Sequence, residues 1–171
     1  MNDIADYLNG LSTEIVETEL QKCCAAEQWI AGMMELRPFA SDAEVLKCAQ
    51  SVWESLSEED YLQAFAAHPR IGDVASLRHK YVNTRQIADD EQSGVREVSE
   101  DVLTLLAERN RVYFEIFGFI FIVFATGKSA DEMLAILNAR LSNDRETELS
   151  NARAEQLKIT KLRLQTIGRP K

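Results

Sequence analysis

The sequence predicts an all-α protein, a single domain over residues 1–171 with about eight helices and one short, extended, Phe-rich buried segment. Seven glycines and three prolines are few for this length, and alanine, leucine and glutamate are abundant, which is typical of helices with short connections. Hydrophobic residues make up 46% and charged residues 27% of the chain, so it can bury one core without a disulfide or a structural metal.

Periodicity and capping residues place these helices along the chain. Apolar residues recur every three or four positions, and serines three residues before an acidic residue mark helix starts at Ser41, Ser57 and Ser129. Asn143, three residues before Glu146, is expected to open the last helix in the same way. The predicted helices cover residues 12–22, 25–36, 42–55, 58–67, 85–95, 99–117, 130–141 and 144–167.

One segment departs from the helical pattern. Residues 116–125 are apolar on every side and rich in phenylalanine, yet too short for a membrane span, which needs about 20 apolar residues. Gly118 favours a break in the helix, after which an extended backbone leaves N–H and C=O groups that need a partner, such as a polar ligand. An ordinary buried helix end fits the same residues.

Charge and cysteine usage exclude several classes of protein. A net charge of −9 repels phosphate, so we expect neither nucleic acid nor membrane as a partner. Three cysteines without regular spacing and an N-terminus without signal-peptide features predict a cytoplasmic protein. His68 and His79 have no paired ligand spacing, and no phosphate-binding loop or dinucleotide motif occurs, so no metal site is predicted.

Three polar residues interrupt apolar helical faces. His68 shares a face with Phe65 and precedes Pro69, so it is expected at a helix C-terminus, where the dipole favours imidazolium. It is either a capping residue or a catalytic one. Glu91, within the stripe 87–95, either pairs or takes part in chemistry, unless it belongs to a solvated acidic face. Arg163, within the stripe 159–167, is a carboxylate clamp, a snorkelling side chain or half of a structural ion pair.

Four motifs in chain order resemble those of the 2-oxo-4-hydroxy-4-carboxy-5-ureidoimidazoline (OHCU) decarboxylases. They are the stretch Phe-Ala-Ala-His-Pro-Arg-Ile-Gly-Asp at 65–73, Glu-Gln-Ser-Gly at 91–94, the block at 110–113 with 117–119 and 121–123, and the tail at 143–148 with 162–164. The resemblance covers nearly the whole chain. It implies an all-α, cofactor-free enzyme, expected as a homodimer, that turns the small molecule OHCU into (S)-allantoin with loss of CO₂ in urate breakdown.

The resemblance also implies roles for individual residues. His68 is the implied catalytic histidine, with Glu91 beside it. The implied substrate-binding residues are Pro69, Ala88, Gln92, Phe121, Ile122, Val123, Phe124, Ala125 and Arg163. Two positions depart from the family pattern, which often has serine at position 88 and proline at position 120, where this chain has Ala88 and Ile120. A helical binding module and a same-fold enzyme for a different ureido acid are the alternative hypotheses.

Overall fold

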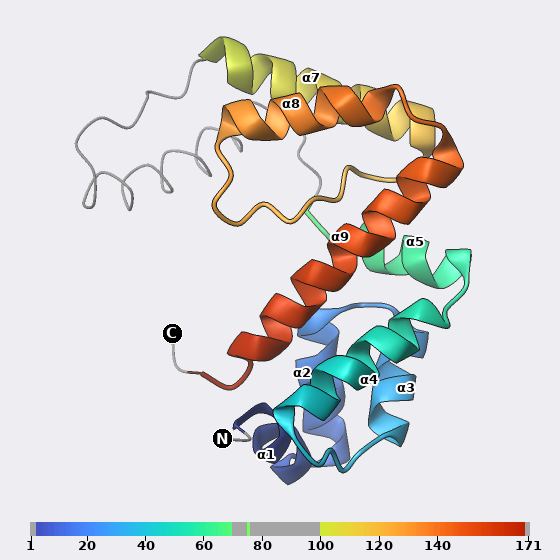
Figure 1. Cartoon of the computed structure of the whole chain (residues 1–171), viewed down its shortest axis with the longest axis vertical. Coiled ribbons are helices and arrows are strands. Elements are labelled where there is room, and N and C mark those ends of the chain that lie inside the picture. Colours follow the sequence, from blue (N-terminus) through green and yellow to red (C-terminus); the bar gives the residue numbers. More distant parts are fainter. Residues whose placement is uncertain (1–2, 70–74, 76–99, 170–171) are drawn as a thin grey trace, which may run out of the picture. The chain divides into compact units, whose positions relative to one another are not determined.

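The structure is a computed structural model that describes residues 3–69, 75 and 100–169. These residues form eight helices and no strand, which confirms the predicted all-α fold (Figure 1). The chain divides into two compact units, Met1–His68 with Arg153–Lys171 and Pro69–Ala152. A single domain over residues 1–171 stays a prediction. Within the described residues, none of the helices has the length and hydropathy that a membrane span requires.

The first unit contains five complete helices and the C-terminal part of the last helix, α9. Their bounds are α1 Asp3–Gly10, α2 Thr13–Cys23, α3 Glu27–Glu35, α4 Asp42–Glu54, α5 Glu58–Ala66 and α9 Arg145–Thr166, of which the part from Arg153 belongs here. Helix α3 contacts α2, α4 and α5. Trp29 on α3 is fully buried, and its indole N–H donates to the Ala49 carbonyl of α4 at 3.1 Å. This side chain therefore anchors α3 to α4 at the centre of the unit.

The predicted helices omit α1, because its N-terminal cap is not local. The backbone N–H groups of Ile4 and Ala5 each donate to the Asp42 carboxylate at 2.9 Å. Asp42 lies in the first turn of α4, far along the chain from the groups it caps. A capping signal supplied by a distant helix cannot be read from the residues around α1.

The second unit contains α7 Glu100–Phe117, α8 Ala130–Leu141 and α9 as far as Ala152. Helix α7 ends at Gly118, which has φ +80°, a conformation that glycine adopts readily, and whose N–H donates to the Phe114 carbonyl at 2.9 Å. Residues 119–125 then run without helix or strand, with Phe119, Phe121 and Ile122 buried. The predicted Phe-rich buried segment is confirmed, and it is not a helix end.

The serine helix starts are confirmed. Ser41 and Ser129 cap α4 and α8, each accepting a hydrogen bond at 3.1 Å from the backbone N–H three residues on. Ser57 and Asp60 form a complete capping box at the start of α5. The predicted helix at 85–95 lies outside the described residues.

The start predicted for the last helix is one residue too early. Asp144, and not Asn143, caps α9, because the Thr147 N–H donates to the Asp144 carboxylate at 2.7 Å. Asn143 instead donates its side-chain amide to Glu148 at 3.0 Å. The asparagine therefore donates to a carboxylate five residues further along the chain and does not cap α9.

Candidate functional site

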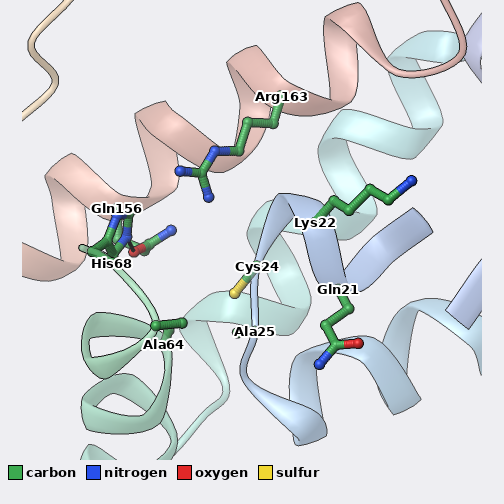
Figure 2. Close-up of a pocket in the computed structure, with 9 residues that line it drawn as sticks. Gln21, Lys22, Cys24, Ala25, Ala64, His68, Gln156 and Arg163 are labelled. Carbon is green, nitrogen blue, oxygen red and sulfur yellow. Dashed lines mark hydrogen bonds between the residues drawn. The ribbon is translucent and has the colours of Figure 1, made fainter. Parts of the chain in front are cut away.

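A cavity of about 330 Å³ lies within the first unit, where the C-terminal ends of α2 and α5 meet α9 (Figure 2). Two groups that can take part in chemistry line it, the His68 imidazole and the Arg163 guanidinium. The full lining is Gln21, Lys22, Cys24, Ala25, Ala64, Ala67, His68, Gln156 and Arg163. The structure thus brings together two of the residues predicted from sequence and places Gln156, which was not predicted, in the same lining.

His68 lies at the C-terminal end of α5, as predicted. Its backbone N–H donates to the Phe65 carbonyl at 3.1 Å, and its half-buried ring places Nε2 2.5 Å from Gln156 Oε1. Burial outweighs the preference for imidazolium that the helix end predicts. Burial lowers the pKa of His68 below its ordinary value, and the charge of Arg163 lowers it further, which outweighs the raising effect of Gln156. His68 is therefore mainly neutral near neutral pH.

The buried face of α9 is not the predicted one. From Arg153 onward, the buried positions of α9 are Gln156, Thr160 and Leu164, with exposed fractions of 1%, 2% and 0%. Arg163, predicted on the inward stripe, is exposed, and Ile159 is only partly buried. Gln156 and Thr160 tolerate burial because the Gln156 side-chain amide donates to the Thr160 hydroxyl at 3.1 Å. The spacing of four between the three buried residues was the signal that could have identified Gln156.

Arg163 reaches the cavity from the exposed edge of α9. Its Nη1 donates to the carbonyl of Cys23, the last residue of α2, at 3.3 Å. Figure 2 shows the guanidinium extending toward the Gln156–His68 pair. One arm of the guanidinium is thus held at a helix end, where a positive charge is favourable, and the group can still present donors to an anion.

The remaining ionisable groups of the cavity are unsuited to nucleophilic chemistry. Burial raises the pKa of the Cys24 thiol to about 11, despite hydrogen bonds from the Ala26 backbone and from Thr160, so this sulfur stays protonated. Lys22 pairs with Glu19 at 2.6 Å, and its ammonium points away from His68 in Figure 2. Across the described ranges, no group of three or more His, Cys, Asp or Glu side chains is placed to hold a metal ion. The arrangement suits proton transfer by His68 beside an anion-binding cation.

A second set of buried polar residues lies in the other unit, around the fully buried Glu148. One carboxylate oxygen accepts from Arg140 Nε at 2.6 Å and from the Tyr113 hydroxyl at 2.8 Å. The other accepts from the side-chain amides of Asn143 at 3.0 Å and Asn151 at 2.7 Å. Burial raises the pKa of Glu148, but these hydrogen bonds outweigh it and hold the pKa below its usual value.

Two cationic side chains, Arg140 from this set and Lys128, bind the backbone of the Phe-rich segment. Arg140 Nη1 donates to the Ile122 carbonyl at 2.7 Å, and Lys128 Nζ donates to the Phe124 carbonyl at 2.6 Å. Two of the carbonyls expected to need a partner are therefore bound by cationic side chains of the protein. In a trans peptide the next N–H points opposite to the carbonyl, so each of these contacts also orients one backbone donor.

The other predicted site residues are not among the described residues that line the cavity. Ala88, Glu91 and Gln92 lie outside the described residues, Pro69 follows His68 and is exposed, and Phe121–Ala125 belongs to the second unit. Their roles stay predictions.

Known proteins resemble this chain over most of its length. The family model described as OHCU decarboxylase matches residues 9–165. The chain is 35% identical over 155 residues to the "Uric acid degradation bifunctional protein TTL" of Arabidopsis thaliana. This match covers 90% of this chain and 48% of that protein. It is 27% identical over 128 residues to a "2-oxo-4-hydroxy-4-carboxy-5-ureidoimidazoline decarboxylase" of Haloferax volcanii, covering 75% of this chain and 73% of that protein.

A solved structure gives a match of similar extent. The crystal structure of an OHCU decarboxylase in the presence of (S)-allantoin superposes with a TM-score of 0.69 at 33% identity, covering 85% of this chain and 94% of that one. The chain spans about half the length of the Arabidopsis relative.

Proposed function

The chain belongs to the OHCU decarboxylase family, and we propose that it is a carboxy-lyase that converts OHCU into (S)-allantoin and CO₂ in urate breakdown. The observation that carries the proposal is His68, neutral and half-buried at the end of α5, in one cavity with the Arg163 guanidinium. Relatives named for uric acid degradation and for this decarboxylation support it.

The main chemical requirement of the reaction is proton transfer. CO₂ leaves C4 of the substrate, its bonding electrons form a C4=C5 double bond, and the C5=N electron pair moves to nitrogen, which takes up the one proton that the reaction consumes. The hydroxyl proton on C4 then moves to one face of C5, which leaves a C4 carbonyl and a single enantiomer. Because the C=N group receives the electrons, the step needs no electron sink from a cofactor.

We assign the proton transfer to His68. A neutral imidazole near neutral pH can accept the hydroxyl proton and return it to carbon. Arg163 offers a planar, charged fork that matches the substrate carboxylate or a ring carbonyl. Glu91 is proposed to act with His68, and Pro69, Ala88, Gln92 and the backbone of Phe121–Ala125 to contact the substrate, as their motifs imply.

The test is formation of chiral product from freshly made substrate. Urate is oxidised and hydrolysed to OHCU, the protein is added, and the circular dichroism of (S)-allantoin is followed against the spontaneous reaction. We expect a faster rise of the signal with a single sign. No acceleration would reject the proposal, and acceleration only with another ureido acid would favour the same-fold alternative. Retained ligand binding without turnover would favour a binding module.

We also propose a homodimer in the cytoplasm. The family resemblance supports the dimer, and the free thiols of Cys23, Cys24 and Cys48 suit a reducing compartment. Sedimentation equilibrium across a tenfold range of protein concentration tests the dimer, and a constant monomer mass would reject it.

A further inference from the structure

A short chain of hydrogen bonds runs from His68 into the buried face of α9. His68 Nε2 lies 2.5 Å from Gln156 Oε1, and Gln156 Nε2 lies 3.1 Å from the Thr160 hydroxyl oxygen. Gln156 and Thr160 are 1% and 2% exposed, so the protein and not solvent determines how they are oriented.

The direction of these bonds follows from the amide of Gln156. Its nitrogen lies 3.1 Å from the Thr160 hydroxyl oxygen, and an amide NH₂ group can only donate, so the hydroxyl accepts this bond. The carbonyl end then faces His68, and a carbonyl oxygen can only accept. His68 Nε2 must therefore carry a proton.

We propose that Gln156 is a positioning residue that fixes His68 in its Nε2–H tautomer, so that Nδ1 is the ring nitrogen that exchanges a proton with the substrate. The part concerning substrate rests on the proposed function. Nδ1 would take the proton of the C4 hydroxyl, and the imidazolium so formed would return the same proton to C5. Gln156 touches neither reacting atom and acts only through the imidazole.

The charged groups around His68 are compatible with this assignment. Arg163 from α9 disfavours imidazolium, and Lys22 from α2 is paired with Glu19. The Cys24 thiol is neutral at physiological pH because burial raises its pKa to about 11. The neutral ring, which alone has tautomers, is therefore the main resting form.

The direct test is the tautomer of His68 in the full chain without substrate. Protein labelled with ¹⁵N-histidine is studied by long-range ¹⁵N–¹H correlation NMR at pH 8, and the His68→Asn variant separates the His68 signals from those of His79. We expect a protonated Nε2 and an unprotonated Nδ1. A protonated Nδ1, or comparable amounts of both tautomers, would overturn the proposal.

Two substitutions at position 156 extend the test to catalysis. Gln156→Leu removes the acceptor, so we expect both tautomers in the NMR spectrum and a fall in kcat of about 10- to 100-fold, as for partners that orient metal-bound histidines. Gln156→Glu places a carboxylate against the ring, which should raise the pKa of His68 and move the acid limb of the kcat profile to higher pH. Gln165→Leu, exposed on the same helix, is the matched control and should change neither.

The outcomes separate this proposal from the proposed function. If Gln156→Leu fails to fold, the wild-type spectrum still decides the tautomer, and the Gln156→Glu titration still tests the contact between residue 156 and the ring. If the wild type does not accelerate OHCU decarboxylation, the proposed function fails, while the NMR result stands by itself. An unchanged acid limb in folded Gln156→Glu would contradict the role of Gln156.

Discussion

The cavity around His68 and the cluster around Glu148 both bury polar side chains, but they use their hydrogen-bonding capacity differently. Glu148 accepts four hydrogen bonds from Arg140, Tyr113, Asn143 and Asn151, which fills the usual capacity of a carboxylate. The His68 ring lines a cavity, and within the described part of the chain its one hydrogen-bond partner is Gln156, at Nε2. Within one chain, a saturated charged group holds structure, and a partly satisfied neutral group can exchange a proton.

The hydrogen bonds also explain why buried Glu148 is charged whereas half-buried His68 is neutral. Both groups have a lowered pKa, but for His68 the cause is burial, which favours the neutral ring, whereas for Glu148 hydrogen bonds overcome burial and keep the carboxylate charged. A charge inside the protein therefore persists where several donors surround it, and disappears where one amide is the partner.

The largest effect is expected from breaking the saturated cluster. Arg140→Met leaves the buried Glu148 charge without its cation and should cost about 3–5 kcal/mol of unfolding free energy in urea melts, since a buried pair loses its compensation. Arg111→Met is the matched control, because the Arg111–Glu115 pair is 59% exposed on both sides and should cost about 1 kcal/mol or less. Equal losses in the two variants would contradict a structural role for the cluster.

The second-largest effect is expected on the rate of catalysis, with little change in stability. His68→Asn keeps a hydrogen-bonding side chain but cannot exchange a proton near neutral pH, so kcat for OHCU should fall by about 100-fold or more. Urea melts of the same variant serve as the control and should stay close to the wild type. Near-wild-type kcat would remove His68 from the mechanism.

Glu91→Gln tests whether His68 has a catalytic partner. We expect a large fall in kcat with little change in fold, and a double variant with His68→Asn that is far from multiplicative, because groups that act as a unit lose most of their effect at the first deletion. A carboxylate near imidazolium raises its pKa, so the limb assigned to His68 should move to lower pH in Glu91→Gln. Multiplicative losses with an unmoved profile would mean that the two residues act independently.

Arg163→Lys should have a smaller effect, on binding. Lysine keeps the charge but loses the planar fork, so KM should rise roughly tenfold, since a charge-assisted hydrogen bond contributes about 1.5 kcal/mol or more, while kcat changes little. Thermal melting distinguishes the alternative. An unchanged KM with a clear loss of stability would show that the contact with the Cys23 carbonyl is only structural.

The smallest effect is a stepwise loss of stability in acid. The pKa of His68 is lowered in the folded protein, so the unfolded chain binds this proton first, and stability should fall as the pH drops from the ordinary value of 6.5 through the folded pKa. The pKa of Glu148 is also lowered, so its stabilisation is complete above the ordinary value of 4.5 and is lost as the pH falls through its folded pKa. Urea melts across pH 3–8 should lose the upper step in His68→Asn and keep the lower one.

The amino-acid sequence determined the features that depend on neighbouring residues. Helix starts at Ser41, Ser57 and Ser129 follow from side chains that cap N–H groups three residues away. The end of α7 follows from the conformational freedom of Gly118, and the place of His68 at the end of α5 follows from Pro69. Each of these effects acts within a turn or two, so the local pattern is sufficient.

Only the tertiary structure decided how the buried polar groups pair. The cap of α1 comes from Asp42. The hydrogen-bond partner of His68 is Gln156, which lies 88 positions further along the chain. Periodicity placed Arg163 on the inward face of α9, because it treats glutamine and threonine as surface residues, whereas Gln156 and Thr160 are buried through the hydrogen bond they share. Whether a polar side chain can be buried depends on the partner that folding brings to it. The residues next to it in the sequence do not identify that partner.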